Sequence, residues 1–377
     1  MTWAAGYCKL AHSPDQFSDQ STENNRDDRR ITSVRAVMSP KLVMDYIPMT
    51  ERAKATVYRY RSEIADIIHA VDSRWLVIVG PCSIHDVSSA VDYAYRLRIL
   101  AEELSNELLV VMRVYFEKPR TTIGWKGMIN DPDLDGTSDL NKGLQIARDL
   151  LNRIADLGVP AACEFLDTMT PQYIGDLVSW AAIGARTAEC QLHRELVSSL
   201  PMSVGFKNST SGDVDVAIDG LLAASHPHSF LSISKQGTPI VVHSCGNDDT
   251  HLVLRGSKSS TNFQRSAVTE AIQKQRSAGL SKRVMIDCSH GNSQKNFRNQ
   301  EVVLDTIIDE QLGDAAILGI MLESNIEEGR QEFSLNTARA NPFVVTKLKY
   351  GQSITDACVG WAQTESMLRK LARALRR

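Results

Sequence analysis

Short apolar runs alternate with amphipathic helical stretches along most of this chain, and this alternation constrains its fold more than any other feature. Strands that alternate with helices are typical of a parallel sheet covered by crossover helices. Eight such runs predict a closed (β/α)8 TIM barrel of the α/β class. The predicted strands are residues 76–80, 109–114, 161–165, 181–185, 203–207, 251–255, 284–287 and 316–323.

The regions outside this alternation predict two additions to the barrel. Residues 1–40 include a long stretch that is poor in aliphatic side chains and rich in polar ones, so we expect a flexible N-terminal arm. Residues 41–377 are expected to form the catalytic barrel domain. Within it, residues 229–245 read as a strand, a glycine-containing turn and a second strand, which predicts an inserted β-hairpin. Helices are predicted over 51–71, 90–104, 140–157, 215–224, 267–278, 301–311 and 356–377.

Composition excludes several classes of function. The chain has 42 basic and 45 acidic residues, and its net charge of −3 gives no sign of a nucleic-acid partner or an anionic membrane surface. The seven cysteines are scattered, as in reduced intracellular proteins. No apolar stretch approaches the roughly 20 residues of a membrane span, and the N-terminus lacks a signal-peptide pattern. We therefore expect a cytoplasmic protein without a membrane partner.

The ends of the predicted strands carry an unusual number of cations. In a barrel of this kind the site lies at the carboxyl ends of the strands, where the loops converge. Six cations gathered there repel one another unless anions lie between them. The expected ligands are phosphates or carboxylates, which arginine and lysine bind well. The six are Arg113, Lys118, Arg120, Arg186, Lys207 and Arg255.

A second set of strand-end residues has the chemistry of metal ligands. Cys82, His290 and Glu323 end or follow strands, and Asp356 lies beyond the last one. A mixture of sulfur, nitrogen and oxygen donors suits Mn²⁺, Fe²⁺, Co²⁺ or Zn²⁺ better than Mg²⁺ or Ca²⁺. The spacing alone does not prove a metal site, but such an ion would act as a Lewis acid on a carbonyl group.

Taken together and in order, the motifs of this chain resemble those of a class I 3-deoxy-D-arabino-heptulosonate 7-phosphate (DAHP) synthase of the microbial, feedback-regulated type. The resemblance covers roughly residues 41–377. The motifs that carry it are residues 80–86 (GPCSIHD), 113–122 (RVYFEKPRTT), 124–127 (GWKG), 182–187 (AIGART), 205–208 (GFKN), 254–256 (LRG), 287–292 (DCSHGN) and 350–356 (YGQSITD).

This resemblance implies a metal-dependent condensation of phosphoenolpyruvate with D-erythrose 4-phosphate, the first step of the shikimate pathway to aromatic amino acids or aromatic secondary metabolites. By position, the metal ligands would be Cys82, His290, Glu323 and Asp356. Lys118 and His290 would transfer protons. Phosphoenolpyruvate would contact Arg113, Lys118, Glu164, Ala185, Arg186, Lys207 and Arg255, and erythrose 4-phosphate would contact Lys118, Pro119, Arg120 and Thr121.

The resemblance also implies an aromatic amino acid effector and a homodimer or homotetramer. In related enzymes the effector binds outside the barrel, in a cavity formed with the hairpin and the N-terminal arm. The hairpin of this chain and residues 198–202 (SSLPM) depart from the usual pattern. We therefore expect altered or lost feedback control, as in an enzyme that serves a secondary pathway.

Three other functions fit part of the pattern. The first is 3-deoxy-D-manno-octulosonate 8-phosphate synthase, which shares the barrel but uses arabinose 5-phosphate; residues 118–122 (KPRTT) argue against it. The second is a Schiff-base aldolase with Lys207 as the nucleophile. The third is a non-catalytic, effector-binding barrel, although such a barrel would be expected to have lost some of the ligands that are present here.

Overall fold

Eight parallel strands close into a barrel in the computed structural model, which describes residues 29–120, 123–280 and 283–376. The chain divides into residues 1–38 and residues 39–377, and the barrel lies in the second part. Most of the predicted N-terminal arm, residues 1–28, lies outside the described residues. The strands follow the order β1-β10-β9-β8-β5-β4-β3-β2, so every strand pairs with its neighbours along the chain once the hairpin β6–β7 is set aside. The predicted TIM barrel is confirmed.

The barrel strands lie within one or two residues of the predicted ones. They are β1 (Trp75–Gly80), β2 (Leu108–Arg113), β3 (Ala161–Glu164), β4 (Trp180–Ile183), β5 (Ser203–Lys207), β8 (Thr250–Leu254), β9 (Val284–Asp287) and β10 (Ile317–Glu323). All their residues are buried, because helices cover the outside of the barrel and side chains fill the inside.

Several of the covering helices begin at polar side-chain caps. Thr50 accepts from the backbone N–H of Ala53, and Asp86 accepts from those of Ser88 and Ser89, which satisfies donors that a helix leaves unpaired. The helices are α1 (Pro40–Tyr46), α2 (Glu51–Ile68), α3 (Val87–Glu103), α4 (Leu140–Asp156), α5 (Thr170–Ile174), η1 (Gly175–Leu177), α6 (Gln191–Val197), α7 (Asp215–Ala224), α8 (Arg265–Ser277), α9 (Asn299–Gln311), α10 (Leu335–Ala340), η2 (Pro342–Lys347) and α11 (Trp361–Leu375).

The last helix starts later than its sequence predicts. We expected a helix from residue 356, but α11 begins at Trp361. The intervening backbone is extended because it pairs with the segment after β10: the N–H of Val359 donates to the Glu323 carbonyl at 3.0 Å, and that of Asn325 to the Val359 carbonyl at 2.9 Å. This pairing fixes Asp356 beside the end of β10.

Closure of the barrel depends on a close approach of β1 and β10. A Cβ atom built at Gly319 would lie 1.8 Å from the Leu76 carbonyl oxygen, so only glycine fits there. The pairing of β10 with β9 shifts register between Ile317 and Gly319. This irregularity lies at the amino-terminal end of β10, and Glu323 ends the same strand at the opposite end.

One end of the barrel is filled by apolar packing. Ile64, Ile67 and Ile68 of α2 belong to the same buried cluster as the strand residues Leu76 and Leu318. Within the barrel, the indole N–H of Trp180 donates to Nε2 of His251 at 3.0 Å, so these buried polar groups satisfy each other. The polar side chains gather instead where the strands end.

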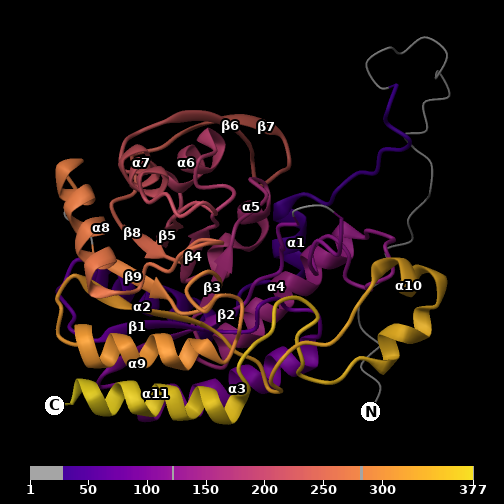
Figure 1. Ribbon diagram of the computed structural model, residues 1–377. Coiled ribbons are helices and arrows are strands. Elements are labelled where there is room, and N and C mark those ends of the chain that lie inside the picture. The colour runs from indigo at the N-terminus through magenta and orange to yellow at the C-terminus, as the bar shows by residue number, and fades with distance from the viewer. Residues whose placement is uncertain (1–28, 121–122, 281–282, 377) are drawn as a thin grey trace. The chain divides into compact units, whose positions relative to one another are not determined.

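The inserted hairpin consists of β6 (Ser229–Ile233) and β7 (Pro239–His243), which pair with each other antiparallel. It is inserted in the sequence between β5 and β8, which are neighbours in the barrel. In Figure 1 it lies at the top of the view, away from α9 and α11. The backbone N–H of Lys41, in α1, donates to the Lys235 carbonyl in the hairpin turn at 2.6 Å. The Lys235 ammonium donates to the Gln172 carbonyl of α5.

Within the described residues, no helix combines the length and apolar character needed to cross a membrane.

Candidate active site

A cavity of about 490 Å³ opens where the barrel strands end. Its walls come from the loops after β2 and β4, from the ends of β3, β5 and β10, and from the loops after β8, β9 and β10. Most of the site residues predicted from sequence line this cavity. They are Lys118, Pro119, Arg120, Glu164, Ala185, Arg186, Lys207, Arg255, His290, Glu323 and Asp356.

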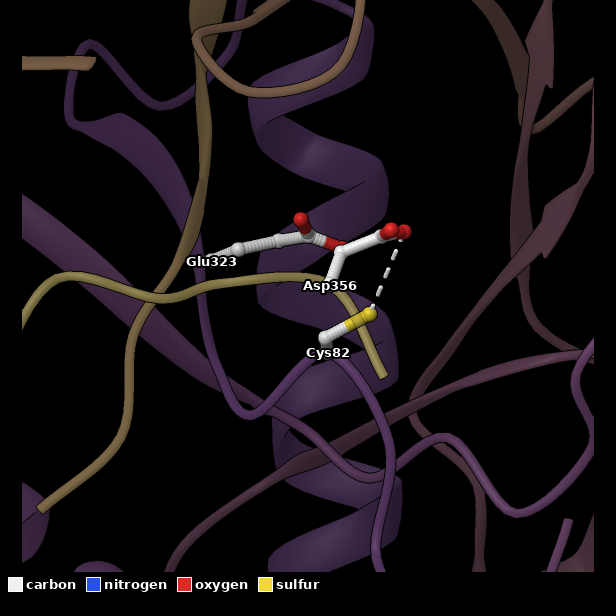
Figure 2. Close-up of side chains that lie close together, drawn as sticks. All are labelled: Cys82, Glu323 and Asp356. Carbon is white, nitrogen blue, oxygen red and sulfur yellow. Dashed lines mark hydrogen bonds between the residues drawn. The ribbon is translucent and has the colours of Figure 1, made fainter. Parts of the chain in front are cut away.

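Three of the predicted metal ligands converge beside this cavity. One donor atom from each of Cys82, Glu323 and Asp356 lies within 4.8 Å of the others, and Figure 2 shows the three side chains together. The Cys82 thiol lies 3.7 Å from an Asp356 oxygen. A thiol from the loop after β1, a carboxylate from the end of β10 and a second from the segment before α11 fit a borderline divalent ion such as Mn²⁺, Fe²⁺, Co²⁺ or Zn²⁺. This cluster could therefore hold a metal ion.

Cys82 is a thiol held beside a cation. Burial raises the pKa of Cys82 to about 12, and the nearby Glu323 carboxylate adds to this effect. The ammonium of Lys118 lies 3.1 Å from the sulfur and also donates to the Cys82 carbonyl at 3.2 Å. Binding of a metal ion would release the thiol proton, since the thiolate is the form that ligates.

Glu323 is a buried carboxylate surrounded by donors. Arg113 donates to one of its oxygens at 3.1 Å, Ser289 donates to the other at 2.8 Å, and Nε2 of His290 lies at 3.6 Å. Burial alone would raise the pKa of Glu323, but His290, Arg113 and Lys118 lower it below its usual value. Glu323 is therefore ionised at neutral pH.

Asp287 contacts both a predicted metal ligand, His290, and a predicted phosphate-binding residue, Lys207. One of its oxygens lies 3.1 Å from the Lys207 ammonium and 2.8 Å from Nδ1 of His290. Asp287 is fully buried, which alone would raise its pKa, yet His290 and Lys207 hold that pKa well below its usual range. His290 has a backbone φ of +53°, so the turn after β9 carries it in the left-handed region. Asp287 thus fixes both His290 and Lys207.

Glu164 and the loop after β4 fit closely together. A Cβ atom at Gly184 would lie 2.0 Å from an oxygen of Glu164, so the absence of a side chain at 184 leaves the carboxylate its place on the cavity wall. Ala185 and Arg186 follow directly. The AIGART motif therefore supplies both space for Glu164 and a cation to the cavity.

Comparison with known proteins identifies the family. The model of the DAHP synthetase I family matches residues 47–369. The chain belongs to this family. It is 50% identical over 351 residues to the Phe-sensitive phospho-2-dehydro-3-deoxyheptonate aldolase of Escherichia coli, covering 93% of this chain and 97% of the relative. Its identity to the tyrosine-inhibited enzyme of Schizosaccharomyces pombe is 47%, over 94% of each chain.

A solved structure also matches. The phospho-2-dehydro-3-deoxyheptonate aldolase of Francisella tularensis superposes with a TM-score of 0.87 at 46% identity, covering 92% of this chain and 99% of that one. The relatives of this DAHP synthetase I family member are named as enzymes, so the predictions of family and of an enzyme are confirmed.

Three predicted site residues do not line the cavity or are not described. Cys82 and Arg113 are fully buried beneath the cavity surface. Cys82 contacts the cavity residue Lys118, and Arg113 contacts the cavity residue Glu323. Thr121 lies outside the described residues. His290 lies beside Glu323 but outside the group of three side chains whose donor atoms converge. The roles of all these residues stay predictions.

Several polar residues on the cavity wall were not singled out from sequence. Lys295 and Arg330 add two cations, and Ser289 supports Glu323. Asp287 appeared only as a member of a family motif. A search limited to strand ends misses Lys295 and Arg330, because they lie several residues into their loops. Only the fold brings them back to the cavity.

Proposed function

We propose that this protein condenses phosphoenolpyruvate with D-erythrose 4-phosphate, giving 3-deoxy-D-arabino-heptulosonate 7-phosphate and inorganic phosphate. The observation that carries the proposal is that a cysteine-carboxylate cluster lies beside a cavity lined by several cations. Two phosphorylated substrates repel each other, and surrounding cations reduce that repulsion while they orient the reacting carbons. The names of the relatives support the same reaction.

Phosphoenolpyruvate would occupy the part of the cavity near β4, β5 and β8. Arg186, Lys207 and Arg255 line it there and would bind the phosphate and carboxylate groups. The Ala185 backbone lies beside them, and Glu164 would hold a water molecule. Arg113 would act from beneath, where its guanidinium contacts Glu323 and stacks 3.8 Å from the centre of the Tyr115 ring.

Erythrose 4-phosphate would bind along the KPRT segment. Lys118, Pro119 and Arg120 line the same cavity, and Arg120 with Thr121 would take the phosphate. Cys82, Glu323, Asp356 and the adjacent His290 would hold the divalent ion. When bound, this ion supplies Lewis-acid polarisation of a carbonyl group. The identity of the ion, among Mn²⁺, Fe²⁺, Co²⁺ and Zn²⁺, is a question for metal analysis.

The reaction would join C3 of phosphoenolpyruvate to the aldehyde carbon of erythrose 4-phosphate. Positive charge would develop at C2, water held by Glu164 would add there, and the C2–O bond to phosphate would break. Lys118 and His290 would transfer protons. Lys118 would start in its protonated form, since burial lowers its pKa but Cys82, Glu323 and Asp356 together raise it above the usual value, so it would give a proton and not take one.

The geometry disfavours a Schiff-base aldolase. The Lys207 Nζ atom is buried and paired with Asp287 at 3.1 Å, whereas the nucleophile of a Schiff-base aldolase must be free to attack a carbonyl carbon. A non-catalytic barrel would have no need of a cluster of one thiol and two carboxylates beside a cavity lined by cations. A 3-deoxy-D-manno-octulosonate 8-phosphate synthase uses arabinose 5-phosphate in place of erythrose 4-phosphate, so a comparison of the two sugar phosphates as substrates distinguishes the two enzymes.

We further propose that an aromatic amino acid effector acts through the hairpin, with a response altered by the divergence of the hairpin and of residues 198–202. The E. coli relative is named Phe-sensitive and the S. pombe relative tyrosine-inhibited. The bond of Lys41 to Lys235 ties α1 to the hairpin turn, and Lys235 reaches α5, so an effector there could act on the barrel. Residues 1–40 would serve as an arm in a homodimer or homotetramer, to be tested by light scattering with and without phenylalanine or tyrosine.

The test is product formation from phosphoenolpyruvate with either erythrose 4-phosphate or arabinose 5-phosphate, followed by mass spectrometry. A seven-carbon product that requires erythrose 4-phosphate supports the proposal. An eight-carbon product made only from arabinose 5-phosphate would assign the octulosonate reaction instead. Absence of both products would favour an effector-binding barrel.

A further inference from the structure

A second cavity, of about 400 Å³, adjoins the candidate active site. It shares Arg186, Arg255 and Lys295 with the first cavity and adds Lys258. Among the described residues that line it, none is acidic. Several cations in one pocket, with no carboxylate to offset them, make the electrostatic potential inside the pocket positive. The pocket therefore favours an anionic ligand.

The loops around this second cavity are fixed by three asparagines. Asn208 Oδ1 accepts from the N–H of Arg255 at 2.8 Å and from the Asn262 amide at 3.1 Å. Asn292 Oδ1 accepts from the N–H of Asn262 at 2.8 Å, and its amide donates to the Leu254 carbonyl at 3.0 Å. Asn208 and Asn292 are buried. These bonds join the loops after β5, β8 and β9.

The serine-rich loop after β8 is also held in place. The Ser257 hydroxyl accepts from the backbone N–H groups of Ser259 and Ser260 at 3.1 and 2.8 Å. A Cβ atom at Gly291 would lie 2.4 Å from the Ser257 nitrogen, so the two loops touch through their backbones. Lys258 projects from a preorganised loop, which lowers the entropic cost of binding an anion.

We propose that the second cavity binds inorganic phosphate and receives the phosphate released from phosphoenolpyruvate while the sugar product still occupies the first cavity. This inference rests on the proposed function. Arg186 and Arg255, which would hold the phosphate of the substrate, line both the first and the second cavity. The leaving group can therefore keep contact with these guanidinium groups as it moves toward Lys258.

The chemistry that precedes this movement is the last step of the proposed reaction. The C2–O bond breaks, its electron pair leaves with the phosphate, and the C2 hydroxyl becomes a carbonyl as its proton passes to the departing phosphate. Movement into the second cavity requires no further bond change. It separates the dianion from the product, which carries a phosphate of its own.

The test is isothermal titration of inorganic phosphate into the full-length protein saturated with phosphoenolpyruvate, without erythrose 4-phosphate, so that no turnover occurs. We expect one phosphate to bind at the second cavity of each chain, in addition to any phosphate at the Arg120 position proposed for erythrose 4-phosphate. Lys258→Ala should weaken this binding about tenfold, since it removes one charge-assisted contact. The matched control is Lys54→Ala, at an exposed position on α2 outside both cavities, which should not change the affinity.

Two results would overturn the inference. One is phosphate binding that disappears when phosphoenolpyruvate is present, because the anion would then bind only in the substrate position. The other is an equal affinity in the Lys258→Ala and Lys54→Ala proteins. Failure of the proposed function is a separate outcome, since it appears as absence of the seven-carbon product, whereas the comparison of Lys258→Ala with Lys54→Ala measures only phosphate affinity.

Discussion

The guanidinium of Arg113 donates to Glu323 at 3.1 Å, and both side chains are only 1% exposed. A buried ion pair gains stability only when further hydrogen bonds satisfy its remaining atoms. Here Arg113 also donates to the Pro81 carbonyl at 3.3 Å, and Ser289 donates to Glu323. The pair therefore sets the position of a carboxylate that belongs to the candidate metal cluster.

Arg113→Met should destabilise the fold, because it leaves the Glu323 carboxylate buried without its guanidinium partner. We expect a loss of about 3 kcal/mol in the free energy of unfolding, measured with urea. The double variant Arg113→Met with Glu323→Gln should lose less than the sum of the single variants, because it removes the unpaired charge. Additive losses would show that the two residues are not coupled.

Gly184→Ala should impair the site while the fold remains. The added methyl group would lie 2.0 Å from Glu164 and would displace that carboxylate from the cavity wall. We expect kcat/KM to fall about tenfold or more, with a circular dichroism spectrum like that of the parent. Gly175→Ala is the control, because its Cβ atom would meet nothing closer than 3.9 Å. Equal activity of the two variants would exclude a role for the position of Glu164.

Stability should depend on pH through Glu117. Burial raises the pKa of this carboxyl to about 8 from an ordinary value of 4.5, and Asp167 contributes. The folded protein thus keeps a proton that the unfolded chain loses, so the contribution of Glu117 to stability falls as pH rises from about 4.5 to 8. Glu117→Gln should therefore be more stable than the parent at pH 8, by roughly 2 kcal/mol, and similar to it near pH 5. A difference that is the same at both values of pH would contradict this account.

Cys82→Ser should remove most of the metal affinity, since a hydroxyl is a poor substitute for a thiolate toward borderline ions. The protein-bound metal, measured by inductively coupled plasma mass spectrometry after dialysis, should fall, and activity should drop about 100-fold or more. Cys190→Ser makes the same chemical change at the start of α6, away from the cluster, and should retain both. Full metal content in Cys82→Ser would exclude the thiol as a ligand.

The sequence predicted the barrel because the period of its apolar residues switches regularly between strand and helix. It also predicted that polar side chains such as Lys207 and Glu323 meet, since the carboxyl ends of parallel strands lie at the same end of a barrel. It could not predict the pairing that delays α11, because the partners after β10 are distant in sequence. Lys258 and Lys295 were not singled out for the same reason: their place depends on the three loops that Asn208, Asn262 and Asn292 join.

The measurement that tests the central claim most directly is the amount of phosphate and of DAHP formed from phosphoenolpyruvate and erythrose 4-phosphate, before chelation, after chelation and after addition of Mn²⁺. We predict equal amounts of the two products, loss of both after chelation, and recovery of both with Mn²⁺. Unchanged product formation in protein shown to be free of metal would contradict the account, as would phosphate release that does not require erythrose 4-phosphate.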